Sequence, residues 1–199
     1  WTGGNNTGIS HALAAGHEHI LVLNNDAFVQ PDTLAAFLAA HADAPDAILG
    51  GVQRTDDGSL KGAVGNRRNP RTGVMTWLPI EELGPPQNGL VATASVIGTA
   101  LFVHRRVYQA IGPFDDDFYL YYDESDWCMR GAKLGHASFV VERAGIRHIG
   151  AASTGGRSSP LVTYFMTRNS LLFVQRHGTW RQLLTLARTI VGGILRDTR

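Results

Sequence analysis

One stretch decides the expected fold: Ile20-Leu21-Val22-Leu23-Asn24-Asn25-Asp26. Its first four residues are apolar without alternation, which predicts a strand buried on both faces, as in the parallel sheets of α/β proteins. Ligands bind beyond the carboxyl ends of such strands, where Asn24 and Asp26 would emerge. A carboxylate there is costly to desolvate unless it is paired, and a divalent cation is a suitable partner. The alternative is that Asp26 caps the helix beginning near Pro31, but Asp32 is better placed to do so.

The composition is that of one globular domain with a substantial core. The chain has 199 residues, 44% of them hydrophobic, and a formal net charge of +1 from 18 basic and 17 acidic residues. This balance, without a long basic run, argues against nucleic acid as the main partner. The single cysteine, Cys128, excludes an internal disulfide framework and a cysteine-rich zinc site, and favours a reducing compartment. No run reaches the roughly 18 apolar residues that a membrane span needs.

The remaining segments alternate strand-like and helix-like patterns, as in α/β proteins. Residues 3–8 are expected to form a glycine-rich loop before a helix over residues 9–15. Such loops can bind phosphate through backbone N–H groups, and a plain turn is the equal alternative. Further strands are expected over residues 47–52, 90–97, 100–103 and 137–141, and a further helix over residues 31–42.

Residues 62–88 show no sustained period and are expected to form a long loop. The loop carries Arg67, Arg68 and Arg71. Two interpretations remain open for this local positive charge. The arginines either fold over an anionic ligand or form an ordinary solvated face.

The densest acidic and aromatic cluster spans residues 114–130. Asp123, Glu124 and Asp126 fall at the start of an expected helix over residues 124–134, where the helix dipole favours negative charge and provides a structural explanation for all three. Asp126 can also pair with Arg130, four residues later. The neighbouring aromatic rings would desolvate Glu124 and raise its pKa, which suits a carboxylate to general-base work.

Two features follow this cluster. His148 comes after another expected strand, so it is either a structural histidine or a ligand at the sheet edge that holds Asp26. Residues 160–175 and 180–195 predict two amphipathic helices. In the second helix an apolar stripe lies apart from Arg181 and Arg188. This helix either packs on the core or lies in a membrane interface, where tryptophan and arginine suit the headgroup zone.

Several motifs, in this order and spacing, resemble family-2 inverting glycosyltransferases of the GT-A fold, especially the bacterial rhamnosyl- and galactofuranosyl-type enzymes. The resemblance covers most of the chain up to about residue 157, and the Arg168-Asn169 pair in the tail. The motifs are Gly-Asn-Asn-Thr-Gly at 4–8, Leu-Asn-Asn-Asp at 23–26, Pro-Asp-Thr-Leu at 31–34, Gly-Thr-Ala-Leu-Phe-Val at 98–103, Gly-Pro-Phe-Asp at 112–115, Tyr-Tyr-Asp-Glu-Ser-Asp-Trp-Cys-Met-Arg at 121–130, and His148 followed by Ser153.

The resemblance implies a donor site. The stretch from Asn24 through Asn25 to Asp26 matches the family's Asp-X-Asp-type motif, with Asp26 holding Mg²⁺ or Mn²⁺ on the sugar-nucleotide diphosphate. His148 matches a histidine that completes the metal site. The glycine-rich segment, with Gly4 and Asn6, is assigned to the same donor-binding region.

The resemblance also implies a catalytic base. The pair Asp123-Glu124 matches the family's Glu-Asp pair, whose second member is the base. Because the two acids are swapped in type here, the base is assigned to Glu124, with Asp123 as the alternative. Asp126 matches the acid that ends the motif.

The expected architecture is therefore a GT-A-type, Rossmann-like α/β fold with a mixed, mainly parallel sheet flanked by helices. The family's opening nucleotide-binding strands are not found before Trp1, so the core is expected to be incomplete at its N-terminus, with impaired nucleotide binding as the alternative. Residues 1–157 are assigned to the catalytic core and residues 158–199 to a segment of amphipathic helices.

The implied activity is metal-dependent, inverting transfer of a rhamnose- or galactofuranose-like sugar from a nucleotide-diphosphate donor to a saccharide or lipid-linked saccharide. It belongs to bacterial cell-surface polysaccharide synthesis, in the cytoplasm or at the cytoplasmic face of the inner membrane. Two alternatives stay open. One is an inactive carbohydrate-binding scaffold. The other is a nucleotidyltransferase, although the basic phosphate-binding motif expected near the start of that class is not visible.

Overall fold

The structure is a computed structural model that describes residues 1–55, 57–60, 62–148 and 159–197. Its helices are α1 Thr2–Ala14, α2 Thr33–Asp43, α3 Ile80–Leu83, α4 Arg105–Ile111, α5 Asp123–Lys133, α6 Pro160–His177 and α7 Trp180–Asp197. Its strands are β1 His19–Leu23, β2 Ala27–Val29, β3 Ile48–Gln53, β4 Gly65–Arg68, β5 Met75–Leu78, β6 Leu90–Thr93, β7 Ala100–His104 and β8 Ser138–His148.

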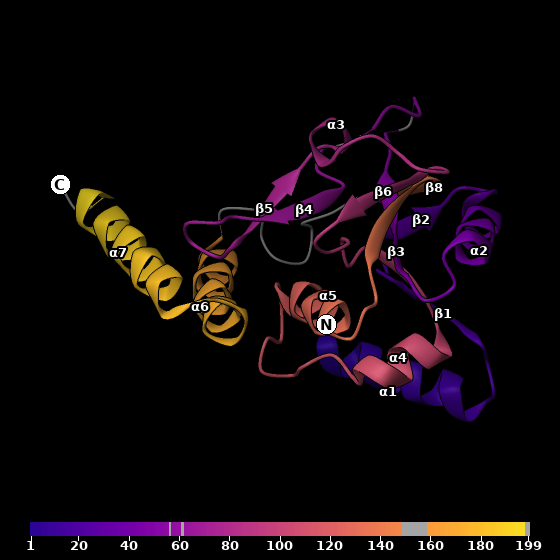
Figure 1. The fold of residues 1–199 in the computed structure, drawn as a ribbon, viewed down its shortest axis with the longest axis horizontal. Coiled ribbons are helices and arrows are strands. Elements are labelled where there is room, and N and C mark those ends of the chain that lie inside the picture. Colours follow the sequence, from indigo (N-terminus) through magenta and orange to yellow (C-terminus); the bar gives the residue numbers. More distant parts are fainter. Residues whose placement is uncertain (56, 61, 149–158, 198–199) are drawn as a thin grey trace.

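A mixed central sheet flanked by helices confirms the expected α/β class (Figure 1). Its strand order is β1-β7-β3-β8-β2, with β6 also paired to β8. The expectation of a mainly parallel sheet is wrong for the described strands, because β3 and β8 are parallel and the other neighbouring pairs are antiparallel. A continuous apolar run indicates that a strand is buried on both faces. It does not indicate whether the strand runs parallel to its neighbours, because strand direction depends on the connections between strands.

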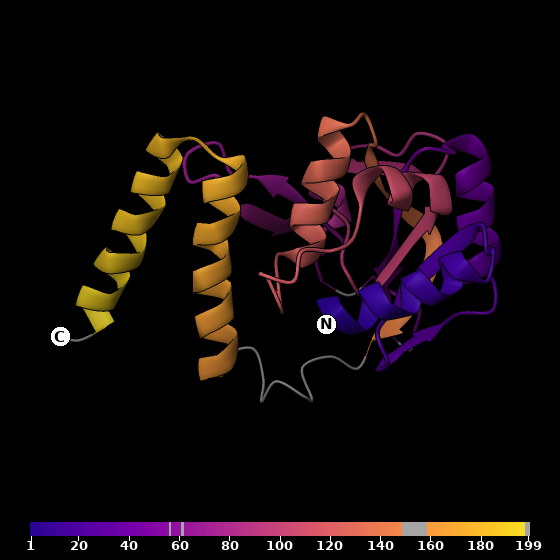
Figure 2. The same cartoon turned by 90° about the horizontal axis from the view of Figure 1, so that it is seen from below.

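Helices cover both faces of the sheet (Figure 2). On one face α1, α4 and α5 enclose a core that includes Val96, Trp127 and Cys128. On the other face α2 packs through Phe37 against a second core. Gly50 on β3 lets the segment before β7 cross the sheet, since a Cβ there would lie 2.5 Å from the Cβ of Val96.

The glycine-rich start of the chain is helical, so the expected loop over residues 3–8 is wrong. Helix α1 spans Thr2–Ala14 and takes in all of that segment. Its own sequence favours a helix weakly, because glycine destabilises helix interiors. Tertiary contacts stabilise the helix instead. Thr2 and Ile9 are buried, and the side chain of Asn6 is hydrogen-bonded to the backbone of Phe114.

The expected loop over residues 62–88 contains regular structure as well. Strands β4 and β5 form an antiparallel hairpin, and the short helix α3 follows. Arg67 donates to the carbonyl of Glu82, and Arg68 donates to the carbonyl of His177 at the end of α6. These two contacts brace the hairpin. Arg67 and Arg71 are exposed, which agrees with the solvated face offered from the sequence, and Arg68 is partly buried.

Both C-terminal helices form as expected, and they continue the packing of the core. Phe173 and Val174 of α6 are buried with Phe118 and Tyr122, and Leu186 of α7 joins the same cluster. The expected boundary between residues 157 and 158 lies outside the described residues. Among the described residues, none of the helices has the length and apolar character required to cross a bilayer.

Candidate active site at one edge of the sheet

Five strands of the sheet meet at the edge where the candidate residues lie. β1 ends there at Leu23, β3 at Gln53 and β8 at His148, whereas β7 begins there at Ala100 and β2 at Ala27. This edge gathers residues from distant parts of the sequence. It is the place where the sequence predicted ligand-binding side chains.

Asp26 and His148 face each other at this edge. The turn after β1 carries Asp26, and Asp26 Oδ1 lies 3.0 Å from His148 Nε2. The amide Nε2 of Gln53 lies 3.4 Å from His148 Nδ1 and donates to Thr99 Oγ1 at 3.2 Å. The amide N–H of Gln53 thus contacts the imidazole on the side away from Asp26, with Nδ1 of His148 as the acceptor.

The geometry of this pair fits a divalent cation. Two ligands at right angles, each about 2.1 Å from an ion, are about 3.0 Å apart, which matches the separation of Asp26 Oδ1 and His148 Nε2. Both side chains are partly accessible, at 31% for Asp26 and 15% for His148, so a bound diphosphate and water could complete the coordination. One carboxylate and one imidazole form a donor set suited to Mn-like ions.

Trp1 and Gly98 connect this pair to the acidic segment of α5. The indole Nε1 of Trp1 donates to Asn24 Oδ1 at 2.9 Å, and the backbone N–H of Asn24 donates to the Thr99 carbonyl at 3.0 Å. A Cβ on Gly98 would lie 3.2 Å from the Trp1 ring and 3.7 Å from Glu124 Oε2. Glu124 thus approaches the backbone directly before β7, within the same edge of the molecule.

Asp123 and Glu124 form a buried acid pair. Their exposed fractions are 2% and 7%, and the two carboxyls are hydrogen-bonded to each other. Burial raises the pKa of Asp123. Burial also raises the pKa of Glu124 well above its usual range, and the charge and hydrogen bond of Asp123 raise it further. Such a pair holds a proton between its members, as two carboxyls in close contact cannot both ionise easily.

The backbone before this pair is strained. Tyr119, Tyr121 and Tyr122 have φ values of 59°, 66° and 67°, in the left-handed region that side-chain-bearing residues seldom adopt. Asn169 of α6 holds the segment, because its Nδ2 lies 2.7 Å from the carbonyls of Phe118 and Leu120 and 2.9 Å from that of Tyr121. Strain held by surrounding structure is common at functional sites.

Asp126 has a different environment from the acid pair. Its carboxylate accepts from Arg130 at 2.9 Å and contacts His177 Nε2 at 2.7 Å, in a nearly buried position. Burial opposes ionisation of Asp126, but the hydrogen bonds from His177 and Arg130 outweigh it and lower the pKa of this carboxyl. The Arg130 pair expected from the sequence is present, and the arrangement ties α5 to α6.

The remaining predicted donor-site residues do not gather in the same way. Asn25 is exposed in the turn after β1. The side chain of Asn6 is hydrogen-bonded to both backbone groups of Phe114 and accepts from the hydroxyl of Tyr108. Gly4 lies in the first turns of α1 and is exposed. This segment is helical and Asn6 is engaged, so the expected glycine-rich loop is not formed, and the assignment of Gly4 and Asn6 to donor binding stays a prediction.

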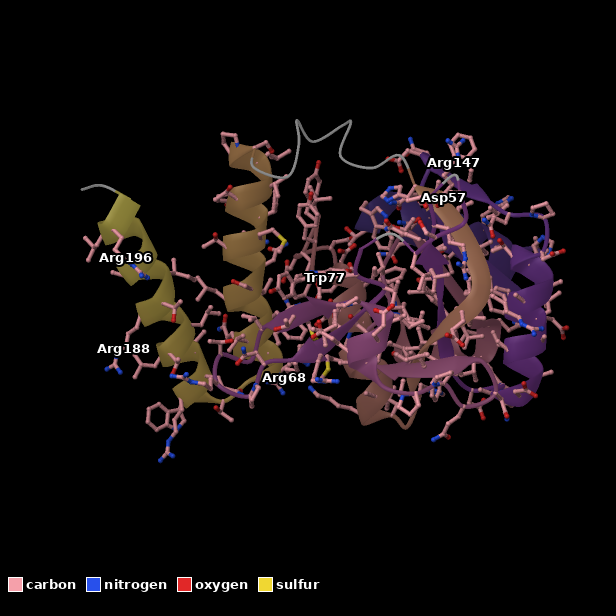
Figure 3. The ribbon with its side chains drawn as sticks, turned by 90° about the horizontal axis from the view of Figure 1, so that it is seen from above. Asp57, Arg68, Trp77, Arg147, Arg188 and Arg196 are labelled. Carbon is pink, nitrogen blue, oxygen red and sulfur yellow. The ribbon has the colours of Figure 1, made fainter. Side chains whose placement is uncertain are left out.

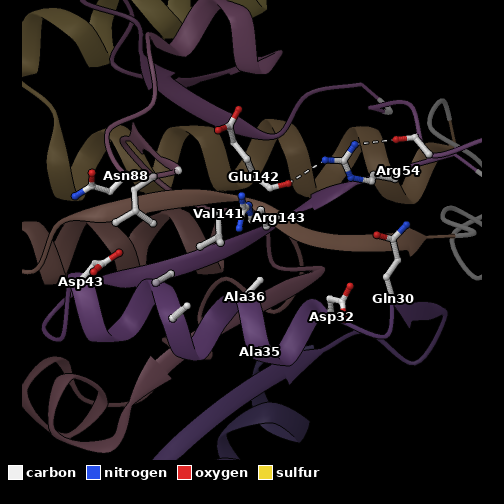
Figure 4. Close-up of a pocket in the computed structure, with 15 residues that line it drawn as sticks. Gln30, Asp32, Ala35, Ala36, Asp43, Arg54, Asn88, Val141, Glu142 and Arg143 are labelled. Carbon is white, nitrogen blue, oxygen red and sulfur yellow. Dashed lines mark hydrogen bonds between the residues drawn. The ribbon is translucent and has the colours of Figure 1, made fainter.

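A hollow of about 1060 Å³ lies elsewhere. Figure 4 shows it above α2, between that helix and strands β6 and β8. Gln30, Asp32 and Asp43 lie along one side, and Arg54 spans the other by donating to the carbonyls of Gly58 and Glu142. None of the predicted site residues lines this hollow. The sheet edge, and not this hollow, therefore holds the candidate chemistry.

Sequence reasoning missed several residues that organise the site. Trp1, Gly98 and Gln53 carry no local signal, because their importance comes from contacts across the sheet. Asn169 was noted as part of an Arg-Asn pair in the tail, but its three carbonyl partners could not be foreseen. A buried amide is expected to be fully hydrogen-bonded, so its partners become visible only once the fold is known.

Comparison with known proteins supports the fold class. No family model matches the chain. Uncharacterized proteins of Mycobacterium bovis and Mycobacterium tuberculosis are 28% identical over 153 residues, which is 75% of this chain and 54% of each relative. The chain thus spans about half the length of the curated relatives it matches.

A solved structure described as GalNAc-T7 with UDP, GalNAc and Mn²⁺ has a similar fold. The TM-score is 0.59 at 12% sequence identity, and the match covers 85% of this chain and 34% of the other. The chain therefore has a GT-A-like α/β fold, as expected from its sequence. At this identity the likeness concerns the fold, and the activity has to be argued from the site.

Proposed function

We propose that this chain carries the catalytic core of a metal-dependent, inverting glycosyltransferase that uses a nucleotide-diphosphate sugar. One observation carries the proposal. The facing pair of Asp26 and His148 and the buried pair of Asp123 and Glu124 are joined at one sheet edge through Asn24, Trp1 and Gly98. The glycosyltransferase fold of the solved neighbour supports this interpretation, and so does that neighbour's description with UDP and Mn²⁺.

The donor end of the site would be formed by Asp26 and His148. A divalent ion bound there would stabilise the negative charge that develops on the departing diphosphate. Gln53 would keep the imidazole of His148 turned toward Asp26. Asn24 would fix the turn after β1 through its contacts with Trp1 and Thr99.

The acid pair would act on the acceptor. In the proposed step a hydroxyl oxygen of the acceptor forms a bond to the anomeric carbon while the bond from that carbon to the diphosphate oxygen breaks. The electron pair leaves with the nucleoside diphosphate, and the hydroxyl proton passes to an ionised carboxylate of the pair. Glu124 is assigned as that base once the pair has released its shared proton, and Asp123, the ionised member while Glu124 keeps the proton, is the alternative. A single displacement of this kind inverts the anomeric centre. Asp126 would have no chemical part, since Arg130 and His177 already occupy its carboxylate.

The substrates follow from the resemblance and not from the site. We assign a rhamnose- or galactofuranose-like donor sugar and a saccharide or lipid-linked saccharide acceptor, in bacterial cell-surface polysaccharide synthesis at the cytoplasmic side of the membrane. The helix α7 is the proposed point of membrane contact. Leu184, Val191 and Leu195 are exposed on it, near Arg188.

Nucleotide binding and sugar transfer test the two pairs separately. Calorimetric titration with UDP and dTDP, with and without Mn²⁺, should give metal-dependent binding of one of them. Asp26→Asn and His148→Ala should each weaken that binding by about tenfold or more. Glu124→Gln should leave donor binding intact and lower kcat by about a hundredfold or more. Glu81→Gln, an exposed carboxylate on α3, is the matched control and should change neither value.

The outcomes separate the proposed enzyme from its alternatives. Full transfer activity in both Glu124→Gln and Asp123→Asn would exclude the acid pair as the base. Loss in Asp123→Asn alone would move the base to Asp123. Saccharide binding without any nucleotide binding would indicate a carbohydrate-binding scaffold. Release of pyrophosphate from a nucleoside triphosphate would indicate a nucleotidyltransferase.

A further inference from the structure

Three histidines meet at the sheet edge opposite the candidate active site. His19 is the first residue of β1, and His104, its partner across the antiparallel pair, is the last residue of β7. His41 lies in the last turn of α2, which packs over the same end of the sheet. Their nearest candidate ligand atoms all lie within 4.8 Å of one another.

The imidazole rings pack on one another and against the ring of Phe102. His19 stacks on Phe102 with ring centroids 5.5 Å apart, and its ring meets those of His41 and His104 edge to face, at 4.8 and 5.3 Å. All three histidines are partly buried. A ring nitrogen of His19, Nε2, is buried and has no hydrogen-bond partner among the described residues. A buried polar atom without a partner is costly, and a bound ion would satisfy it.

Burial and nearby positive charge disfavour protonation of His41 and His104. Burial lowers the pKa of His41, and the charges of His19, His104 and Arg106 lower it further, against the opposing effect of Asp46. Burial and the charge of Arg106 likewise lower the pKa of His104. Asp46 is paired with the guanidinium of Arg106 at 2.9 Å, so it does not neutralise the histidines directly.

We propose that His19, His41 and His104 form a binding site for a transition-metal ion of the Zn²⁺ class, which ties the end of α2 to the end of the sheet. Three imidazoles without a carboxylate favour Zn²⁺, Ni²⁺ or Cu²⁺ over Mg²⁺ and Mn²⁺. This site is distinct from the pair of Asp26 and His148, because His19 begins β1 and Asp26 follows the other end of that strand. It does not depend on the proposed glycosyltransferase activity.

Binding would require small local movements. Nitrogen ligands of a tetrahedral zinc ion are about 3.3 Å apart, so the rings have to close from their present separations of up to 4.8 Å. His41 can approach by side-chain rotation at the end of its helix. His104 Nδ1 now accepts the N–H of Arg106 at 3.2 Å at the start of α4. Coordination by His104 would therefore give up this cap, which predicts that metal binding loosens the first turn of α4.

Titration of the protein, freed of any polyhistidine tag, with Zn²⁺ tests the site. Calorimetry should show one ion bound per chain, and Co²⁺ should give the visible absorption of a tetrahedral site. His41→Ala should weaken binding by about tenfold or more and remove the rise in Tm that Zn²⁺ causes. His41→Gln serves as a second variant if the alanine form folds poorly, with circular dichroism as the check.

Two controls make the result specific. His17→Ala removes an exposed histidine two residues before His19 and should leave Zn²⁺ binding unchanged. His148→Ala should also leave it unchanged, which separates this site from the candidate active site. Absence of Zn²⁺ binding by the wild type, or equal binding by His41→Ala, would overturn the proposal and identify the three rings as packing residues only.

Discussion

At the scale of single residues, the three acids at the start of α5 differ by the partners that each one has. Asp126 is nearly buried, yet Arg130 and His177 compensate its charge and lower its pKa. Asp123 and Glu124 are also buried, but each carboxyl interacts mainly with the other. One carboxyl oxygen of Asp123 has no hydrogen-bond partner among the described residues. Burying two acids without a paired arginine, lysine or histidine is destabilising, so a functional reason for the pair is the natural inference.

The raised pKa values predict how stability depends on pH. Because the folded state holds the shared proton more tightly than the unfolded state, the pair's contribution is fully present below the unfolded value of about 4.3 and is lost as pH rises through the raised pKa of Glu124. Thermal unfolding between pH 4 and 9 should therefore show a fall in the wild type that is smaller in Glu124→Gln. The difference between the two curves isolates the pair from other titrating groups. Parallel curves would contradict the shared proton.

At the scale of elements, α6 holds the strained segment that leads into α5. Asn169 is fully buried and binds three carbonyls of that segment, and Arg176 pairs with Asp115 and Asp117 just before it. Hydrogen bonds from one side chain to several carbonyls can hold a backbone in a conformation that its own sequence disfavours. Helix α6 thus positions the acid pair although it lies outside the expected catalytic core.

Removal of this brace should affect both stability and chemistry. Asn169→Ala leaves three carbonyls with fewer partners, and we expect a loss of about 2 kcal/mol in the free energy of unfolding. The left-handed tyrosines should then relax and displace Glu124, which lowers kcat more than it raises KM. Ser170→Ala is the matched control, since Ser170 is the next residue on α6 and, among the residues that the structure describes, its hydroxyl is hydrogen-bonded to Thr167 of the same helix. Equal effects of the two variants on kcat would refute a positioning role for Asn169.

The elements that the sequence predicted well are those with strong local patterns. The starts of α6 and α7, and the strand β7, agree with expectation because periodicity and burial are local properties. The first half of helix α1 and the hairpin of β4 and β5 were missed, because tertiary contacts override the weak helix and strand preferences of the glycines, arginines and prolines there. In the site, the sequence indicated Asp26, His148 and Glu124 by type and position. It could not indicate Trp1, whose role depends on an approach to Gly98 across the fold.

At the scale of the whole molecule, α7 has two apolar faces, one packed against the protein and one exposed. Leu183, Leu186 and Ile190 pack toward α6. At about 100° per residue, the exposed residues Trp180, Leu184, Val191 and Leu195 fall within about 60° of one another on a second face. Arg181 and Arg188 border that second face, and Figure 3 shows Arg188 on the side of α7 away from α6. Core packing, one of the two alternatives for this helix, therefore explains the first face and leaves the second unexplained.

An apolar stripe bordered by arginines is suited to the surface of an anionic membrane. The protein should therefore float with vesicles that contain anionic lipid and should bind less at high salt, because screening weakens the contribution of the arginines. Replacement of Leu184, Val191 and Leu195 by glutamine should reduce flotation severalfold without lowering Tm, as these side chains are exposed. Leu38→Gln, an exposed leucine on α2, is the matched control and should float like the wild type. Failure of the wild type to float would leave α7 as a packing helix whose outer face has another use.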